Sequence, residues 1–219
     1  MTDQSNWPIE AELFAELPES VDNITFTPSN DVIYSQHPFF DSDIRVARLN
    51  VDRKSYDAFP NLDWNTVKAD TDHYLDTVLG IRCDGAGVVW MMDIGTRTGV
   101  TPKLVGWNTN TDRLERIYYV PAPATLSTSQ HNDFTLDEKR RQIIIADEGI
   151  ANGGDGTPAA LVVNDMKTGA TRRLLQGHES CLPEEVSIMV GGRELTAENG
   201  QPLLIGAEGI VSNLGYGRP

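Results

Sequence analysis

Short runs of β-branched and aromatic residues, separated by clusters of Gly, Pro, Asn and Asp, make up most of the 219-residue chain. Runs of this kind predict strands joined by turns. A helical period is found only over residues 8–17 and 65–78, each long enough for a turn or two of helix. The hydrophobic pattern therefore predicts an all-β chain.

The predicted strands recur in one order, four to a unit, and this order is repeated three times. In the first unit the strands are expected at residues 24–27, 32–35, 44–51 and 56–59. In the second unit they are expected at residues 81–83, 88–92, 103–107 and 116–120. In the third unit they are expected at residues 134–136, 142–146, 160–163 and 171–175. A further strand at residues 209–212 would open a fourth unit.

A sheet of four short strands cannot bury both faces alone, so the units must pack side by side. Four-stranded repeats spaced by about 50 residues are typical of β-propeller blades, whereas a β-sandwich would not repeat a four-strand order with matching turns. The sequence predicts a single partial β-propeller domain over residues 1–219. Its units span about residues 10–61, 79–121 and 132–177, and the start of a fourth lies near residue 208.

Charge narrows the range of partners. The chain has 18 Lys and Arg residues against 32 Asp and Glu residues, a formal net charge of −14. Such a charge repels phosphate backbones and acidic membrane surfaces, so we expect no nucleic acid and no membrane as partner. Residues 1–7 lack the basic and apolar regions of a signal peptide, which indicates a cytoplasmic protein or an export signal outside this chain. The two cysteines, Cys83 and Cys181, are expected to be free and buried.

Several stretches, in order over residues 10–210, resemble the major royal jelly protein and yellow protein family in its bacterial form. The clearest are Leu-Gly-Ile-Arg at residues 79–82 and Val-Trp-Met-Met-Asp-Ile-Gly at residues 89–95. Thr-Pro-Lys-Leu-Val at residues 101–105 and Gly-His-Glu-Ser at residues 177–180 continue the pattern. The resemblance implies a six-bladed propeller and secretion, with a distant similarity to propellers of the gluconolactonase and senescence-marker type. The family pattern extends several blades beyond residue 210, so the resemblance implies a truncated chain of three blades and one strand of a fourth.

The first strand of a propeller blade lines the central channel, and its first residues lie near the channel mouth. Aligning the first strands places Asp22, Asn132 and Glu208 in one column, which Leu79 interrupts. Hard cations such as Ca²⁺ prefer carboxylate and amide oxygens. The gluconolactonase-like propellers hold a divalent metal through Glu, Asn and Asp at strand starts, so the resemblance implies a metal site at these three residues. The alternative is that their polar groups cap strand ends.

The neighbouring column contains Asn23 and Asp133. Successive strand residues face opposite sides of a sheet, so one of the two columns can face the channel. His131 precedes Asn132 and could reach the channel mouth, although a place in a loop is the simpler interpretation. Asn23, His131 and Asp133 are therefore the candidates for binding a small-molecule ligand.

Other distinctive residues are expected to serve the fold. Asp93 and Asp147 each end a second strand and are closely followed by a glycine, where a carboxylate can accept hydrogen bonds from turn N–H groups. Trp90 and Trp107 are expected to pack between blades rather than to stack on a ligand. The Gly-rich residues 153–156 lack the Lys of a P-loop, and the chain contains no G-x-S-x-G nucleophile motif.

Three interpretations of function stay open. The first is a propeller that binds a small organic ligand in its channel without catalysis, aromatic or amine-bearing, with the negative charge favouring a cation. The second is a lactonase-like hydrolase in which Ca²⁺ or another divalent cation polarises a lactone carbonyl or activates water. The third is a truncated product without function. Three blades would also leave two open blade faces, which favours self-association.

Overall fold

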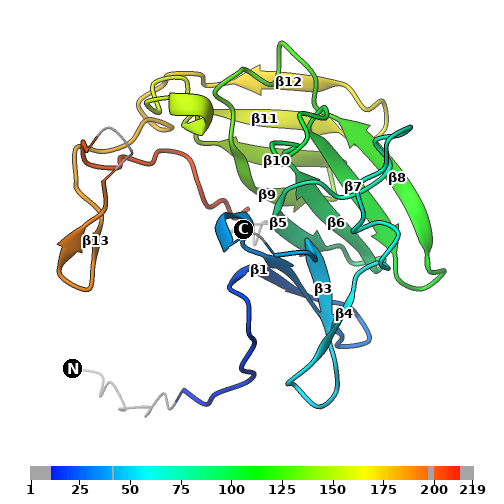
Figure 1. Ribbon diagram of the computed structural model, residues 1–219. Coiled ribbons are helices and arrows are strands. Elements are labelled where there is room, and N and C mark those ends of the chain that lie inside the picture. Colours follow the sequence, from blue (N-terminus) through cyan, green and yellow to red (C-terminus); the bar gives the residue numbers. More distant parts are fainter. Residues whose placement is uncertain (1–10, 41, 197–199, 213–219) are drawn as a thin grey trace, which may run out of the picture.

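The computed structural model describes residues 11–40, 42–196 and 200–212, in which three four-stranded antiparallel sheets follow one another along the chain (Figure 1). The first sheet comprises β1 (Val21–Phe26), β2 (Val32–Gln36), β3 (Val46–Leu49) and β4 (Tyr56–Ala58). The second comprises β5 (Val78–Cys83), β6 (Val88–Asp93), β7 (Lys103–Asn108) and β8 (Arg113–Tyr119). The third comprises β9 (His131–Asp137), β10 (Gln142–Asp147), β11 (Ala160–Asp165) and β12 (Thr171–Leu174).

Three short elements accompany the sheets. The 3₁₀ turn η1 (Pro38–Phe40) follows β2, and η2 (Ala151–Gly153) follows β10. A two-stranded hairpin, β13 (Met189–Val190) and β14 (Arg193–Glu194), follows the third sheet. No helix in the described part of the chain is long and apolar enough to cross a membrane.

The first strands of the three sheets lie next to one another, β1 against β5 and β5 against β9. In Figure 1 the sheets fan outward from these strands, with β4, β8 and β12 at the outer edges. Successive blades of a β-propeller are arranged in this way. The predicted all-β propeller fold is therefore confirmed, with β1, β5 and β9 innermost.

All twelve strands predicted for the three units are present, and the largest error is at four strand starts. Each of β1, β5, β8 and β9 begins three residues earlier than expected. In β8 the added residues are mostly polar and exposed, so they give no hydrophobic signal. In the other three strands a bulge interrupts the alternation of the pattern.

Two smaller expectations were wrong. Residues 11–17 and 65–78 contain no helix, and residues 8–10 lie outside the described residues. The strand expected at residues 209–212 is not formed either. These residues contact β9 through side chains instead, as in the 2.8 Å hydrogen bond between the hydroxyls of Thr135 and Ser212.

Two apolar cores lie on the two faces of the second sheet. Met91 and Val105 contribute to the core shared with the first sheet, and Met92 and Leu104 to the core shared with the third. All six residues of β6 are buried because this strand has a neighbouring sheet on each face. Trp90 and Trp107, one in each core, are 3% and 7% exposed, as expected for packing residues.

Both cysteines are free. Cys181 is buried, as expected, whereas Cys83 is only half-buried. Burial, together with the negative charge of Asp84, raises the pKa of the Cys83 thiol to about 11. A thiol in this state is a poor nucleophile at neutral pH.

Candidate functional site

Each innermost strand has a one-residue bulge near its start. In β5 the pairing moves from Val78–Asp93 to Ile81–Met91, so three steps along β5 match two along β6. The same irregularity is present in β1 after Val21 and in β9 after His131. Bulges bend a strand and redirect its side chains. They place three residue pairs in equivalent positions: Asp22 and Asn23, Leu79 and Gly80, and Asn132 and Asp133.

The first residues of the three bulges line one cavity of about 1010 Å³. Asp22, Leu79 and Asn132 lie along its wall, and Glu208 from the segment after the hairpin lies along it too. The residues that the sequence alignment placed in one column therefore lie around one cavity. Two carboxylates and one amide from separate parts of the chain face the same cavity.

Glu148 is a further cavity residue, and the sequence analysis did not identify it. It directly follows β10 and is 1% exposed. One of its oxygens accepts a hydrogen bond from the Asn132 amide, and the other accepts from the Gln130 amide at 2.7 Å. Burial raises the pKa of Glu148 to about 7; the Asn132 hydrogen bond works against this, and the negative charge of Glu208 adds to it.

Only the position of Glu148 in the repeat could have revealed it. Glu148 follows the second strand of the third sheet, just as His37 follows the second strand of the first sheet. Both residues line the cavity. Comparing the residues just after the second strands, and not only those at the starts of the first strands, would have found both.

His37 lies between the Asp22 carboxylate and two aromatic rings at the edge of the cavity. Its Nε2 lies 3.6 Å from Asp22 Oδ1, and burial raises the pKa of Asp22 against the opposing effect of His37. The rings of Phe39 and Phe40 contact the His37 ring edge to face, with centroid distances of 4.6 and 5.6 Å. Phe39 also lines the cavity and is 77% exposed. The cavity therefore combines carboxylates with an accessible aromatic surface.

Asp133, one of the predicted ligand-binding residues, holds the C-terminal segment and does not line the cavity. Its Oδ2 accepts a hydrogen bond from the Arg82 guanidinium at 2.6 Å and from the Ile210 backbone N–H at 3.4 Å. Arg82 also donates to the Ile210 carbonyl oxygen at 3.1 Å. These contacts hold the segment that carries Glu208 beside β9.

Asn23 likewise lies away from the cavity wall. Its backbone N–H donates to the Ser35 hydroxyl at 3.1 Å, and that hydroxyl donates to the Leu79 carbonyl oxygen at 2.7 Å. Ser35 thereby links the bulge of β1 to the bulge of β5. The backbone of Asn23 supports the site, and its side chain is not among the groups that line the cavity.

His131 is fully buried and is not at the channel mouth. Its Nε2 lies 2.8 Å from the Thr125 hydroxyl, and its Nδ1 lies 3.6 Å from Asp147 Oδ2. Burial lowers the pKa of His131 to about 4, in spite of the neighbouring Asp147 carboxylate. Because the bulge places His131 opposite Asp147 in the ladder, the ring enters the blade interior rather than a loop.

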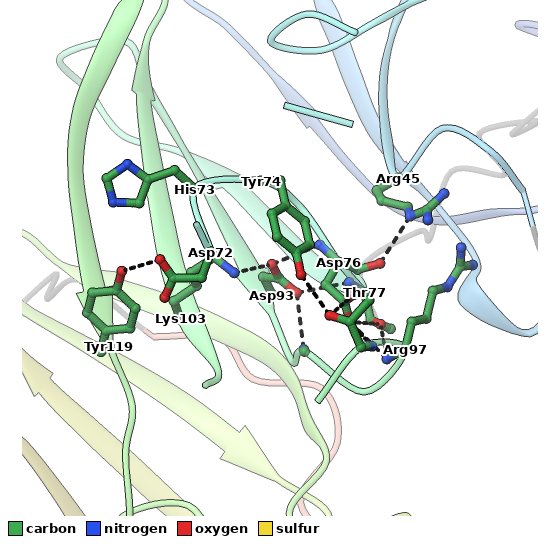
Figure 2. A network of polar contacts seen from close by, with 12 residues as sticks. Arg45, Asp72, His73, Tyr74, Asp76, Thr77, Asp93, Arg97, Lys103 and Tyr119 are labelled. Atoms are coloured by element: carbon green, nitrogen blue, oxygen red, sulfur yellow. Dashed lines mark hydrogen bonds and ion pairs between the residues drawn. The ribbon is translucent and has the colours of Figure 1, made fainter. Parts of the chain in front are cut away.

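Asp93 and Asp147 serve the fold, as predicted from their repeated position, and they also hold the chain segments that enter the innermost strands. Figure 2 shows the network around Asp93, which accepts hydrogen bonds from the backbone N–H groups of Asp76 and Thr77, each at 2.9 Å. Lys103 Nζ donates to the same carboxylate at 2.8 Å, and both side chains are fully buried. Asp76 in turn accepts from the Arg97 backbone N–H at 2.8 Å.

Asp147 has the same arrangement in the third sheet. It accepts hydrogen bonds from the backbone N–H groups of Gln130 at 2.9 Å and Gly149 at 3.0 Å. Arg173 supplies the cation, with its guanidinium nitrogen 2.5 Å from Asp147 Oδ2. The two carboxylates therefore fix the starts of β5 and β9, which form part of the cavity wall.

The fit of a metal ion depends on how many oxygens converge. Among the described residues, no group of three or more His, Cys, Asp and Glu side chains could hold a metal ion. Asp22, one of the expected ligands, already has a partner, because its Oδ1 lies 3.6 Å from His37 Nε2. Asp22, Asn132 and Glu208 line one cavity, and metal binding there stays a prediction.

Solved structures similar to this chain are distant. Hydrazine synthase from Kuenenia stuttgartiensis aligns over 71% of this chain and 37% of its own, with 10% identity and a TM-score of 0.45. A luciferin-regenerating enzyme aligns over 71% and 47%, with 9% identity and a TM-score of 0.42. An auxiliary nutrient binding protein from Bacteroides ovatus aligns over 70% and 46%, with 11% identity and a TM-score of 0.34. The chain spans less than half the length of each.

Sequence comparison gives a more specific result. The comparison with curated proteins finds no match. The family described as "Major royal jelly protein" matches residues 77–211. That region includes β5 to β12, the bulges of β5 and β9, and the cavity residues Asn132, Glu148 and Glu208. Because the match covers more than half of the 219 residues, the chain belongs to the major royal jelly protein family.

Proposed function

We propose that the chain binds a small organic cation in the cavity at the bulged starts of β1, β5 and β9, and does no chemistry on it. The observation that carries the proposal is that three carboxylates, Asp22, Glu148 and Glu208, line this cavity. Burial is the main cause of the raised pKa of Asp22 and of Glu148, and the charge of Glu208 adds to it in both. A bound cation would offset this repulsion and favour the charged carboxylates.

The rest of the wall suits the apolar part of such a ligand. Phe39 presents an exposed ring at the rim, and Leu79 lies between the acidic positions. Aromatic faces attract organic cations, by about 0.5–2 kcal/mol. A cavity of about 1010 Å³ is large enough for a ligand of drug size.

Titration calorimetry with benzylamine and with uncharged benzyl alcohol tests the proposal. We expect benzylamine to bind at least ten times more tightly than the alcohol, because only the amine carries a charge at neutral pH. Replacing Asp22 by Asn and Glu208 by Gln (D22N/E208Q) should remove this preference. The control D57N/D70N removes two exposed charges away from the cavity and should retain it. Equal binding of the two compounds would contradict the proposal.

A lactonase-like hydrolase with a divalent cation is the second candidate. The observation in its favour is that Asp22, Asn132 and Glu208, aligned from the sequence alone, line the same cavity. Three ligands fall short of the six to eight oxygens that Ca²⁺ takes, so we expect weak binding. Calcium binding that is lost in the variant N132A/E208Q would support this candidate. Absence of any heat on titration with calcium chloride would eliminate it.

A further inference from the structure

A second pocket, of about 280 Å³, lies between the second and third sheets. It is lined by residues of the turn after β5, such as Asp84, and of the turn after β11, such as Lys167. The acidic cavity lies near the starts of β5 and β9, whereas this pocket lies near their ends. The two sites are therefore at opposite ends of the blades and are independent of each other.

Three cations surround this pocket. Arg116 comes from β8, Arg141 from the turn between β9 and β10, and Lys167 from the turn between β11 and β12. All three side chains are exposed, and none forms an ion pair within the described residues. In a chain with 32 acidic and only 18 basic residues, such a gathering of cations is unexpected. With Asp84 and Glu115 counted, the pocket lining has three cations and two carboxylates, a formal charge of +1 on a molecule of net charge −14.

Neither of the two carboxylates in the pocket lining, Asp84 and Glu115, forms an ion pair with these cations. Asp84 accepts hydrogen bonds from the backbone N–H groups of Ala86 and Val88 and from the Trp90 indole N–H, all at 2.9–3.0 Å. Glu115 accepts from the Asn108 amide at 3.1 Å. Both carboxylates are thus held by neutral donors rather than by a cation of the pocket, and Arg116 lies over the Tyr118 ring at 5.6 Å.

The wall of the pocket is aromatic and firmly held. The rings of Trp90 and Tyr118 stack with a centroid distance of 5.5 Å and an interplanar angle of 18°. A Cβ at Gly106 would lie 2.6 Å from the Trp90 ring, so the glycine makes room for the stack. The Tyr118 hydroxyl donates to the Met166 carbonyl oxygen at 2.5 Å and so connects the two sheets across the pocket.

We propose that this pocket binds a small organic anion, namely a carboxylate attached to a flat apolar group. Guanidinium groups recognise carboxylates through paired hydrogen bonds, and Arg116 and Arg141 supply two of them. The apolar group would lie against Met166 and the small exposed parts of the Trp90 and Tyr118 rings, which are 3% and 5% exposed. This site is separate from the cation site proposed above, and it takes a ligand of the opposite charge.

The test uses the whole chain with 2-naphthoate, and with 2-naphthamide as an uncharged compound of the same shape. Titration calorimetry should show naphthoate binding at least ten times more tightly than naphthamide. The location is read by NMR of the methionine methyl groups, because Met166 lines this pocket and no methionine lines the acidic cavity. We expect naphthoate to shift the Met166 methyl resonance.

Two variants with the same change in net charge distinguish binding by the cations of the pocket from attraction by the charge of the whole molecule. The pocket variant R116Q/R141N/K167Q should weaken naphthoate binding at least thirty-fold; Asn is chosen at residue 141 because its φ is 54° and Asn tolerates this conformation. The control R113Q/K139Q/R172Q removes three exposed cations that do not line the pocket, and it should bind within two-fold of the unaltered chain. Thermal unfolding confirms that both variants are folded.

The remaining outcomes would overturn the proposal. Equal weakening in both variants would mean that net charge alone attracts naphthoate. Equal binding of naphthoate and naphthamide would mean that the cations play no part. An unchanged Met166 resonance at saturation would place the ligand elsewhere. Failure of benzylamine to bind would leave this proposal unaffected, because the two sites share no residue.

Discussion

Gly80 and Asn132 are in direct contact through their backbones at the bulges of β5 and β9. A Cβ at Gly80 would lie 2.7 Å from the Asn132 carbonyl oxygen and 3.1 Å from the Asp133 Cα. Backbone atoms cannot turn aside as a flexible side chain can, so any side chain at Gly80 would separate the two strands. The cavity depends on this contact, because Leu79 and Asn132 on its wall are adjacent to the contact point.

Gly80→Ala should therefore destabilise the fold and loosen the cavity. We expect a loss of about 1–3 kcal/mol, the usual cost of forcing a methyl group into a packed interior, measured by urea unfolding. Gly85→Ala is the matched control, since a Cβ there would have its nearest neighbour at 3.5 Å, an ordinary contact. Equal stability of the two variants would show that β5 and β9 can separate without cost.

The buried pair of Asp93 and Lys103 gives a second prediction. Lys103→Met would leave the Asp93 carboxylate buried without its cation, and we expect a loss of about 3–5 kcal/mol. Lys68→Met breaks the exposed pair with Asp63, whose oxygen lies 2.6 Å from Lys68 Nζ, and should cost less than about 1 kcal/mol. Chemical denaturation of both variants provides the comparison. Similar losses would mean that Asp93 is held by its backbone hydrogen bonds alone.

Glu148 should make stability depend on pH in a defined direction. Its pKa is about 7 in the folded chain and near 4.5 when unfolded, so the folded state keeps a proton that the unfolded state has lost. This stabilisation is present below about pH 4.5 and is lost as the pH rises through about 7.

The variant Glu148→Gln isolates this effect. Between pH 5 and pH 8, the unaltered chain should lose about 1–3 kcal/mol more unfolding free energy than E148Q, because one pKa unit corresponds to about 1.4 kcal/mol. Titrating groups that do not interact with Glu148 contribute equally to both proteins and cancel in the difference. Parallel pH profiles for the two proteins would place the Glu148 pKa near its ordinary value.

The repeat made the fold predictable. Each four-strand unit gives the same hydrophobic pattern, and three copies fix which runs are strands and which strands are innermost. The errors lie where the pattern is locally broken. The bulges of β1, β5 and β9 interrupt the alternation, so these strands were expected to begin at residues 24, 81 and 134, three residues late.

The site was only partly predictable for a related reason. The alignment grouped Asp22, Asn132 and Glu208, and all three line one cavity because equivalent positions of neighbouring repeats lie close together. It could not show which way neighbouring side chains point at a bulge. His131 therefore lies in the blade interior, Asp133 pairs with Arg82, and Glu148 was missed because its contacts depend on how β10 leaves the sheet.

Self-association through the outer face of the first sheet is the last prediction. Ile24 and Phe26 alternate on β1 and therefore face the same side, where they are 49% and 56% exposed. Val21 adds a third exposed apolar side chain on this strand. Burying apolar area contributes about 25 cal/mol per Å², and apolar patches of this kind are common at protein interfaces. We therefore expect the chain to form dimers or larger species at micromolar concentration.

Sedimentation velocity over a concentration series tests this, with the double variant I24T/F26T as the probe. Threonine keeps a high preference for strands, so β1 should persist while its apolar face is lost, and the apparent mass should fall to that of a monomer. Val51→Thr is the control, because Val51 lies in a turn and is fully exposed, at 101%, away from β1. It should associate as the unaltered chain does. A monomer in the unaltered chain, or association that persists in I24T/F26T, would show that this face does not hold the copies together.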